Sequence, residues 1–382
     1  MSLFNLVGHG NDPASKLTNE FYRLLFMDRL LWRGYPSESP RFERKQKIVD
    51  QLHEVTGFEN NDQEEPLGEL DADTVTRESF IEASLNFQRP VIVRGFAKNN
   101  PAITNWTAPY LKEKLGNQIC TPLTWTKDIE GKDWDVCAKI SQMTFAEFFE
   151  RMHDEPIYIN ANTEAATGDH SLVEELDLGK IQDTFTTPGE SWDELVLLNF
   201  FIGSSHVHSQ LHTAVGGNFF LMINGRKKWT LMDPKYSAYI HPVTRRPYQT
   251  FRSRYGGYRA QRALGASADH PLFRPPLHEF VLEPGDLFYN APWWWHEVEN
   301  LDPFSVGVAV RHTPPPFASS PSWANQSLFT LAGIYPVGRS MTYAHWLFQK
   351  LTGYKKPLRE ILHPINNKAF ANLYKNTKDD PS

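Results

Sequence analysis

The chain has 382 residues, of which 40% are hydrophobic and 13% are aromatic. This supplies enough apolar material for a packed core and excludes a largely disordered protein. The formal net charge is −6 and the isoelectric point is near 6.2, which gives no reason to expect a nucleic-acid-binding surface.

Cysteine content and hydropathy together predict a soluble cytoplasmic protein. The chain contains only two cysteines, Cys120 and Cys137, which excludes a disulfide scaffold and suits a reducing compartment. The first residues lack the basic start and continuous apolar core of a signal peptide. No apolar run approaches the roughly 18 residues of a membrane span. We therefore expect neither a membrane nor a nucleic-acid partner.

Residues 1–74 are predicted to form a helical extension that ends in an acidic linker. The first helix is expected to begin at Pro13, after Asp12 as N-cap, and to carry apolar residues at helical spacing. The second is expected over residues 40–56, with a shared apolar face made by Ile48, Leu52 and Val55. Residues 59–73 are rich in Asp and Glu and are interpreted as a solvated linker.

Residues 75–313 are predicted to form the main domain. A short helix over residues 77–87 and a β-strand over residues 90–94 open it. Beyond Glu194, short strands separated by turns are typical of an antiparallel sandwich or barrel; they are expected at 195–202, 218–224, 228–232, 279–282, 286–290 and 305–310. The pair Asn224-Gly225 predicts a hairpin between two of them.

Residues 234–276 form a long insert within this domain. A loop of this length is either a functional lid or disordered. Its arginines either clamp an anionic substrate or are solvated loop charges: Arg245, Arg246, Arg252, Arg254, Arg259 and Arg262. Residues 314–382 are predicted to be a C-terminal helical extension. Helices at both ends of the chain are expected to pack on the domain or to support a homodimer.

The chemistry is concentrated in two stretches, residues 201–233 and 283–312, each containing a histidine among apolar strand-like runs. A mononuclear non-haem iron site usually needs two imidazoles and one carboxylate. Positions 212 and 214 lie at i and i+2 of a strand, so their side chains point the same way from Cα atoms roughly 6.6 Å apart. His212, with His296 from a distant strand, fits two corners of such a site. Ala214 occupies the third position.

The motifs around these histidines resemble the JmjC/cupin-like branch of iron(II)- and 2-oxoglutarate-dependent oxygenases. The first motif reads LHTAVGGNFF from Leu211, ending in Gly225-Arg226-Lys227. The second reads EPGDLFY from Glu283, followed by PWWWHEVEN. The stretch RPVIVRG from Arg89 is also similar to an opening strand of this family. The resemblance implies a double-stranded β-helix (jelly roll), mainly β with helical decoration.

Transferred by position, the resemblance implies that His212 and His296 bind Fe(II). Lys227 would pair with the distal carboxylate of 2-oxoglutarate, because Lys227 and Lys228 point to opposite faces and the Gly-x-Lys spacing favours the former. The assisting residues would be Ser209 or Asn218. Arg311 stands where many members of the family have an asparagine that contacts the co-substrate.

Ala214 replaces the acidic ligand of the family, and three interpretations remain open. The iron- and 2-oxoglutarate-dependent halogenases resemble this chain at that position, where a small residue makes room for chloride. Alternatively, His208 or Gln210, which share strand parity with His212, supplies the third ligand. His208 is roughly 13 Å away along a straight strand and needs a bend. Finally, the site is catalytically silent and the fold serves as a binding module.

We therefore predict an Fe(II)- and 2-oxoglutarate-dependent oxidoreductase that acts on an unactivated C–H bond of a small molecule or peptide. Ala214 favours radical halogenation, with bound chloride, over hydroxylation. Trp293, Trp294 and Trp295 are interpreted as a substrate-stacking wall or as core residues, since alternating residues of a strand face opposite sides.

Overall fold

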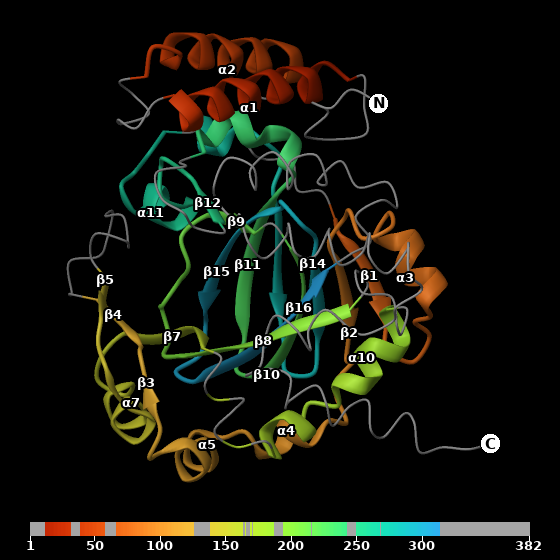
Figure 1. The fold of residues 1–382 in the computed structure, drawn as a ribbon, viewed down its shortest axis with the longest axis vertical. Coiled ribbons are helices and arrows are strands. Elements are labelled where there is room, and N and C mark those ends of the chain that lie inside the picture. Colours follow the sequence, from red (N-terminus) through yellow and green to blue (C-terminus); the bar gives the residue numbers. More distant parts are fainter. Residues whose placement is uncertain are drawn as a thin grey trace.

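The computed structural model describes residues 12–31, 39–57, 66–125, 138–162, 165, 169, 171–186, 194–214, 216–242, 250–267 and 269–313. Its strands form two large sheets and one pair (Figure 1). The strands are β1 (Gly68–Asp71), β2 (Val91–Arg94), β3 (Ile119–Cys120), β4 (Leu123–Trp125), β5 (Ala138–Ile140), β6 (Met143–Thr144), β7 (Ile157–Asn162), β8 (Glu194–Gly203), β9 (His212–Ala214), β10 (Gly217–Asn224), β11 (Lys227–Met232), β12 (Thr250–Arg252), β13 (His278–Leu282), β14 (Leu287–Asn290), β15 (Trp295–Asn300) and β16 (Ser305–Thr313).

The two large sheets give the jelly roll that the sequence predicted. The larger sheet has the order β1-β2-β14-β10-β16-β8-β7-β4-β5, and the smaller has the order β12-β9-β15-β11-β13. All of these pairings are antiparallel except that of β1 with β2. Strands β8 to β11 and β13 to β16 alternate between the two sheets, so that none of them pairs with the next strand along the chain, as expected for a jelly roll. The fold is therefore mainly β with helical decoration.

The main core fills the space between the sheets. Strand β10 is buried from Gly217 to Ile223, and its residues pack with apolar side chains of both sheets. The ring of Phe220 on β10 lies so close to the backbone of the neighbouring strand β16 that a glycine is required there. A Cβ atom at Gly307 would lie 2.2 Å from the ring of Phe220, too close for any side chain there. Tight packing here fixes the strands that lead into the smaller sheet.

The turn at Asn224-Gly225 is confirmed, but the predicted hairpin is wrong. Gly225 has φ +69°, which favours glycine, and the turn joins β10 to β11. These strands do not pair, because β10 lies between β14 and β16 while β11 lies between β13 and β15. The turn thus carries the chain from one sheet to the other. An Asn-Gly pair specifies a reversal of direction, whereas the partners of each strand depend on distant sequence.

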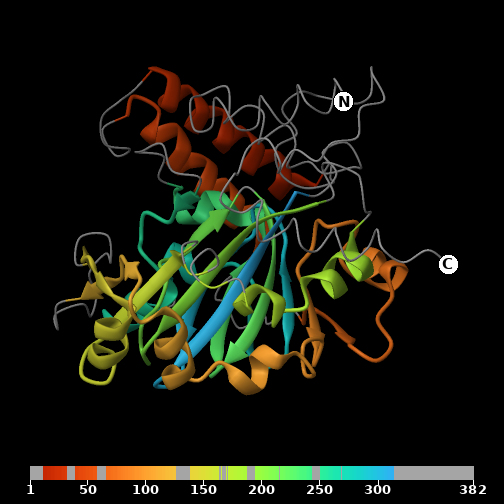
Figure 2. The same cartoon turned by 60° about the horizontal axis from the view of Figure 1, so that its bottom comes forward.

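Helices surround the sheets, and one pair of them forms a separate layer at one end of the molecule (Figure 1). The helices are α1 (Pro13–Leu31), α2 (Phe42–Thr56), α3 (Arg77–Ala83), α4 (Pro101–Asn105), α5 (Ala108–Leu115), α7 (Phe145–Arg151), α9 (Ser171–Glu174), α10 (Leu178–Phe185), α11 (Tyr258–Ala263), η2 (Pro234–Ile240) and η3 (Pro271–Phe273). In Figures 1 and 2, α1 and α2 lie side by side across the top of the molecule. Both contact η2, and this junction has its own apolar core.

Both predicted N-terminal helices are confirmed, and three details of this region and of the start of the main domain are corrected. Val55 is 49% exposed, whereas Ile48 and Leu52 are fully buried, so the apolar face of α2 ends before Val55. The segment interpreted as a linker contains β1, which extends the larger sheet. The helix predicted over 77–87 stops at Ala83, because the residues after it turn with positive φ at Leu85, Asn86 and Phe87.

The described part of the insert, residues 234–242, 250–267 and 269–276, is structured rather than a bare loop. It contains η2, β12, α11 and η3, and β12 pairs with β9 beside His212. The predicted C-terminal helices lie outside the described residues, and the predicted homodimer stays a prediction. No helix in the described segments is both long and apolar enough to cross a membrane.

Candidate metal and co-substrate site

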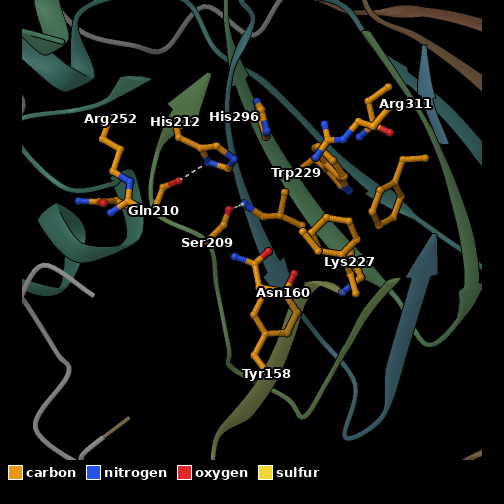
Figure 3. A pocket seen from close by; sticks show the side chains of 15 residues that line it. Tyr158, Asn160, Ser209, Gln210, His212, Lys227, Trp229, Arg252, His296 and Arg311 are labelled. Carbon is orange, nitrogen blue, oxygen red and sulfur yellow. Dashed lines mark hydrogen bonds between the residues drawn. The ribbon is translucent and has the colours of Figure 1, made fainter. Parts of the chain in front are cut away.

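The structure brings the two predicted histidines together. His212 on β9 and His296 on β15 are direct partners in the smaller sheet, and their ring centroids lie 4.2 Å apart (Figure 3). The strands are adjacent rather than facing. Opposed residues of an antiparallel pair project from the same face of the sheet, so both rings enter one cavity.

Backbone carbonyls fix the protonated nitrogen of each ring. Nδ1 of His212 lies 2.7 Å from the carbonyl oxygen of Gln210, and Nδ1 of His296 lies 2.9 Å from that of Trp294. A carbonyl only accepts, so each Nδ1 carries the hydrogen and each Nε2 has the lone pair that a metal requires. Asn290 Nδ2 lies 3.4 Å from Nε2 of His296, at the long limit of a hydrogen bond.

Burial keeps both imidazoles neutral at pH 7. It lowers the pKa of His212 to about 4 and the pKa of His296 well below its ordinary value. The nearby positive charge of Arg311 lowers the pKa of each ring further. Neutral imidazole is the form that binds a metal ion. The pair therefore fits two corners of a metal site without loss of a proton.

The third corner has no acidic residue. Ala214 lies two residues beyond His212 on β9 and ends at a methyl group, which cannot coordinate. Among the described residues, no group of three His, Cys, Asp or Glu side chains could hold a metal ion. A metal bound here would thus have two protein ligands and more exchangeable positions than the usual three-ligand site.

Neither proposed substitute ligand provides a third strong donor. His208 does not line the cavity. Its backbone forms an isolated β-bridge with Glu299, and its Nδ1 accepts a 3.1 Å hydrogen bond from Arg259. Gln210 does line the cavity, but an amide is a weak metal ligand. His208 lies outside both β9 and the cavity lining, so it is not placed as a ligand beside His212.

The cavity has a volume of about 220 Å³ and combines charged, polar and apolar walls. Besides the histidines, its polar and charged lining residues are Tyr158, Asn160, Ser209, Gln210, Asn218, Lys227, Arg252 and Arg311. Its apolar lining residues are Ala161, Phe201, Phe220, Trp229 and Val298, of which Trp229 stacks on His296 with ring centroids 5.7 Å apart. No Asp or Glu belongs to this lining.

Lys227 is the buried cation that the motif predicted. Its side chain is fully buried, and Nζ donates to Asn300 Oδ1 and lies 5.6 Å from the ring centroid of Tyr158. Burial lowers the pKa of this ammonium to about 7. Lys228 faces the other side of the sheet, where Nζ lies 2.9 Å from Glu279 Oε2. Of the two lysines, Lys227 lines the cavity and Lys228 does not.

The other predicted co-substrate residues also reach the cavity. Ser209 Oγ accepts a 3.0 Å hydrogen bond from the amide of Val298, which leaves its hydroxyl hydrogen for a ligand. Asn218 is buried, and its Oδ1 has no partner within the described residues. The Nε of Arg311 donates to Asn199 at 3.1 Å.

Several residues that line the cavity could not be recognised in the sequence, and one group considered as a substrate-stacking wall does not line it. Tyr158, Asn160 and Trp229 carry no motif that marks them, and Arg252 was one of six equivalent arginines in the insert. Conversely, none of the three consecutive tryptophans lines the cavity. All are buried, and the indoles of Trp294 and Trp295 donate to Gln88 and Ser237. They are core residues.

A jelly roll with two histidines paired in one cavity defines a cupin-type protein. Residues 77–316 match the family described as the Cupin-like domain, and the chain belongs to this family. The jelly-roll fold inferred from the sequence is therefore confirmed by two independent findings.

Several curated proteins are similar to this chain. Bovine HSPB1-associated protein 1 is 26% identical over 250 residues, 61% of this chain and 50% of that protein. The human HSPB1-associated protein 1 is 30% identical over 127 residues, 32% and 24% of the two chains. Mouse tRNA wybutosine-synthesizing protein 5 is 23% identical over 258 residues, 63% and 76% of the two. The chain thus spans half the length of the bovine relative, and less of the human one.

Proposed function

We propose that this chain is a non-haem iron(II)- and 2-oxoglutarate-dependent oxidoreductase that acts on an unactivated C–H bond of a small molecule. The observation that carries the proposal is the pairing of His212 and His296 at 4.2 Å in the cavity that also buries Lys227. A buried ammonium without a carboxylate in the cavity lining suits a ligand that brings its own carboxylate.

Each residue has a distinct task in this proposal. The Nε2 atoms of His212 and His296 would hold iron(II), which supplies oxygen activation coupled to the oxidation of 2-oxoglutarate. Lys227 binds the distal carboxylate of 2-oxoglutarate, and the hydroxyl hydrogen of Ser209 adds a donor. The aromatic walls, Phe201 and Phe220, exclude water from the reacting centre.

Ala214 favours halogen transfer as the specific reaction. A residue that ends at Cβ frees one coordination position and removes a negative charge, and Arg311 adds positive charge beside the histidines. Both features favour a small anion such as chloride at the vacated corner. A hydroxylase with a substitute ligand is the weaker candidate, because His208 does not line the cavity. The near absence of cysteine supports a reducing, cytoplasmic setting.

Metal analysis after anaerobic equilibration with iron(II) tests the proposed metal site. We expect one iron per chain in the wild type and loss of stoichiometric iron in His296→Ala. His278→Ala is the matched control, because His278 is also buried in the smaller sheet but does not line the cavity. Iron retained by His296→Ala, or absent from the wild type, would overturn the oxidoreductase and leave the binding-module interpretation.

Ala214→Asp separates halogen transfer from hydroxylation. The new carboxylate restores a third ligand, so we expect tighter iron binding and loss of any chloride dependence of 2-oxoglutarate consumption. Turnover by the wild type should require chloride. If chloride has no effect on the wild type and Ala214→Asp keeps native turnover, the halogenation proposal is wrong.

A further inference from the structure

The charges that line the cavity are all positive. Lys227, Arg252 and Arg311 line it, and no carboxylate belongs to the lining. In the proposed function, 2-oxoglutarate places its distal carboxylate at Lys227, at one end of this cavity.

Arg252 lies at the other end of the cavity from Lys227. It is the last residue of β12 and the register partner of His212 on β9, so its side chain leaves the same face of the sheet. Figure 3 shows Arg252 beyond His212, with Lys227 and Arg311 across the histidine pair from it. Arg252 is half-buried. It is therefore placed to meet a ligand that enters next to the histidines.

Two buried polar atoms in the lining also point to a ligand. The indole Nε1 of Trp229 and Oδ1 of Asn218 have no hydrogen-bond partner in the part of the chain that the structure describes. Trp229 is 2% exposed and Asn218 is 4% exposed, and both line the cavity. Unpaired buried polar atoms are costly, so a polar ligand that pairs with them is favoured. The indole N–H of Trp229 would donate to an oxyanion, whereas Oδ1 of Asn218 is an acceptor and needs a donor group on the ligand.

We propose that Arg252 binds an oxyanion group of the substrate, so that this protein acts on a small organic anion. The proposal rests on the proposed function, because it assigns the Lys227 end to 2-oxoglutarate and the Arg252 end to the substrate. The guanidinium fork of arginine matches a carboxylate or a phosphate group, and either chemistry fits.

The size of the cavity limits the substrate. About 220 Å³ lies below the roughly 300–1,000 Å³ of pockets that enclose drug-sized ligands. A cavity that also holds a co-substrate leaves room for a compact molecule. The inferred substrate class is therefore a small carboxylate or phosphate ester with its target carbon close to the charged group.

The insert supplies a matched control for Arg252. Arg254 lies two residues further along the chain, does not line the cavity, and stacks over the ring of Phe42 at 5.2 Å. Arg252→Gln and Arg254→Gln remove the same charge, one inside the cavity and one outside it. Arg252→Lys keeps the charge but loses the planar fork.

The test is a calorimetric titration of the full chain, kept anaerobic with saturating iron(II) and 2-oxoglutarate. The probes are acetate, inorganic phosphate and neutral acetamide. We expect the wild type and Arg254→Gln to bind acetate or phosphate but not acetamide. Arg252→Gln should bind the same anion about tenfold more weakly or worse, with Arg252→Lys between. Acetate and phosphate distinguish a carboxylate substrate from a phosphorylated one.

The outcomes separate this proposal from the proposed function. Equal anion binding by Arg252→Gln and the wild type, no anion binding by the wild type, or acetamide binding as tight as acetate would each overturn it. Retained 2-oxoglutarate binding by Arg252→Gln shows that the variant is folded. If the wild type binds neither iron nor 2-oxoglutarate, the titration is repeated without them. Selective loss in Arg252→Gln then keeps the anion site while the oxidoreductase proposal fails.

Discussion

Burial controls the protonation of Lys227. The pKa of this amine is lowered to about 7, so in the unliganded protein it is about half protonated at neutral pH and mostly neutral at pH 8. A carboxylate beside the nitrogen favours the charged form and raises the pKa again. Binding of 2-oxoglutarate is therefore coupled to protonation of one side chain.

We predict uptake of close to one proton when 2-oxoglutarate binds at pH 8. Titration calorimetry in two buffers of different ionisation enthalpy measures this number directly. Lys227→Met should bind 2-oxoglutarate more than about tenfold more weakly and without proton uptake. Binding to the wild type with no proton exchange would contradict the role given to Lys227.

The same residue predicts how stability depends on pH. The pKa of Lys227 is lower in the folded protein than in the unfolded chain, where it is about 10.4. Between about pH 7 and pH 10 the unfolded state thus binds more protons, and the free energy of unfolding contributed by Lys227 rises with pH. Denaturant unfolding of the unliganded protein should show this rise, and Lys227→Met should lack it.

Residue-level prediction succeeded where a side chain's face follows from strand parity. Lys227 and Lys228 alternate along β11, so only one of them can enter the cavity, and His212 and His296 were marked by their motifs. Arg252 could not be singled out. It lies in an insert whose sequence has no clear period, and its position depends on β12 pairing with β9.

At the scale of elements, helix α11 of the insert is held to the smaller sheet by Glu297. This carboxylate on β15 accepts hydrogen bonds from the backbone amides of Tyr258 and Arg259 at the start of α11, at 2.6 and 3.1 Å. A Cβ atom at Gly257 would lie 2.4 Å from Glu297 Oε2. The start of α11 therefore tolerates no side chain at Gly257 without displacement of this carboxylate.

Gly257→Ala should destabilise the protein by about 1–3 kcal/mol, because it overpacks this contact. Gly68→Ala in β1 is the control, since its added Cβ would meet no atom closer than 3.7 Å. Urea unfolding of both variants measures the difference. Equal midpoints for the two variants would show that α11 is not held in this way.

Element prediction failed where pairing is set by distant sequence. The Asn224-Gly225 turn was read correctly, but its two strands belong to different sheets. Strand β1 was missed because Gly68–Asp71 is short, half-exposed and lies within an acidic segment. Strand β9 has only three residues and gives no periodic signal of its own.

On the scale of the whole molecule, the N-terminal helices support the strands that carry the histidines. The second core contains Leu52 of α2 together with Leu211 and Trp295, the chain neighbours of His212 and His296. The helix pair was expected from sequence as an appendage that packs or dimerises. Because the helix pair shares an apolar core with η2 and with the residues next to both histidines, it helps to hold the site in place.

Leu52→Ala should lower the free energy of unfolding by about 2–5 kcal/mol, because it leaves a cavity in this fully buried core. Val55→Ala, on the same helix but 49% exposed, should change it by less than about 0.5 kcal/mol. Thermal or denaturant unfolding distinguishes them. Similar small effects for both variants would mean that the helix pair contributes little to stability.

We propose above all that a two-histidine site binds iron(II) together with 2-oxoglutarate held by Lys227. Anaerobic titration of the full chain with both ligands, followed by visible absorption, tests it most directly. We expect the weak charge-transfer band of chelated 2-oxoglutarate in the wild type and in His278→Ala, and its loss in His296→Ala. No band in the wild type, with no iron on metal analysis, would contradict it.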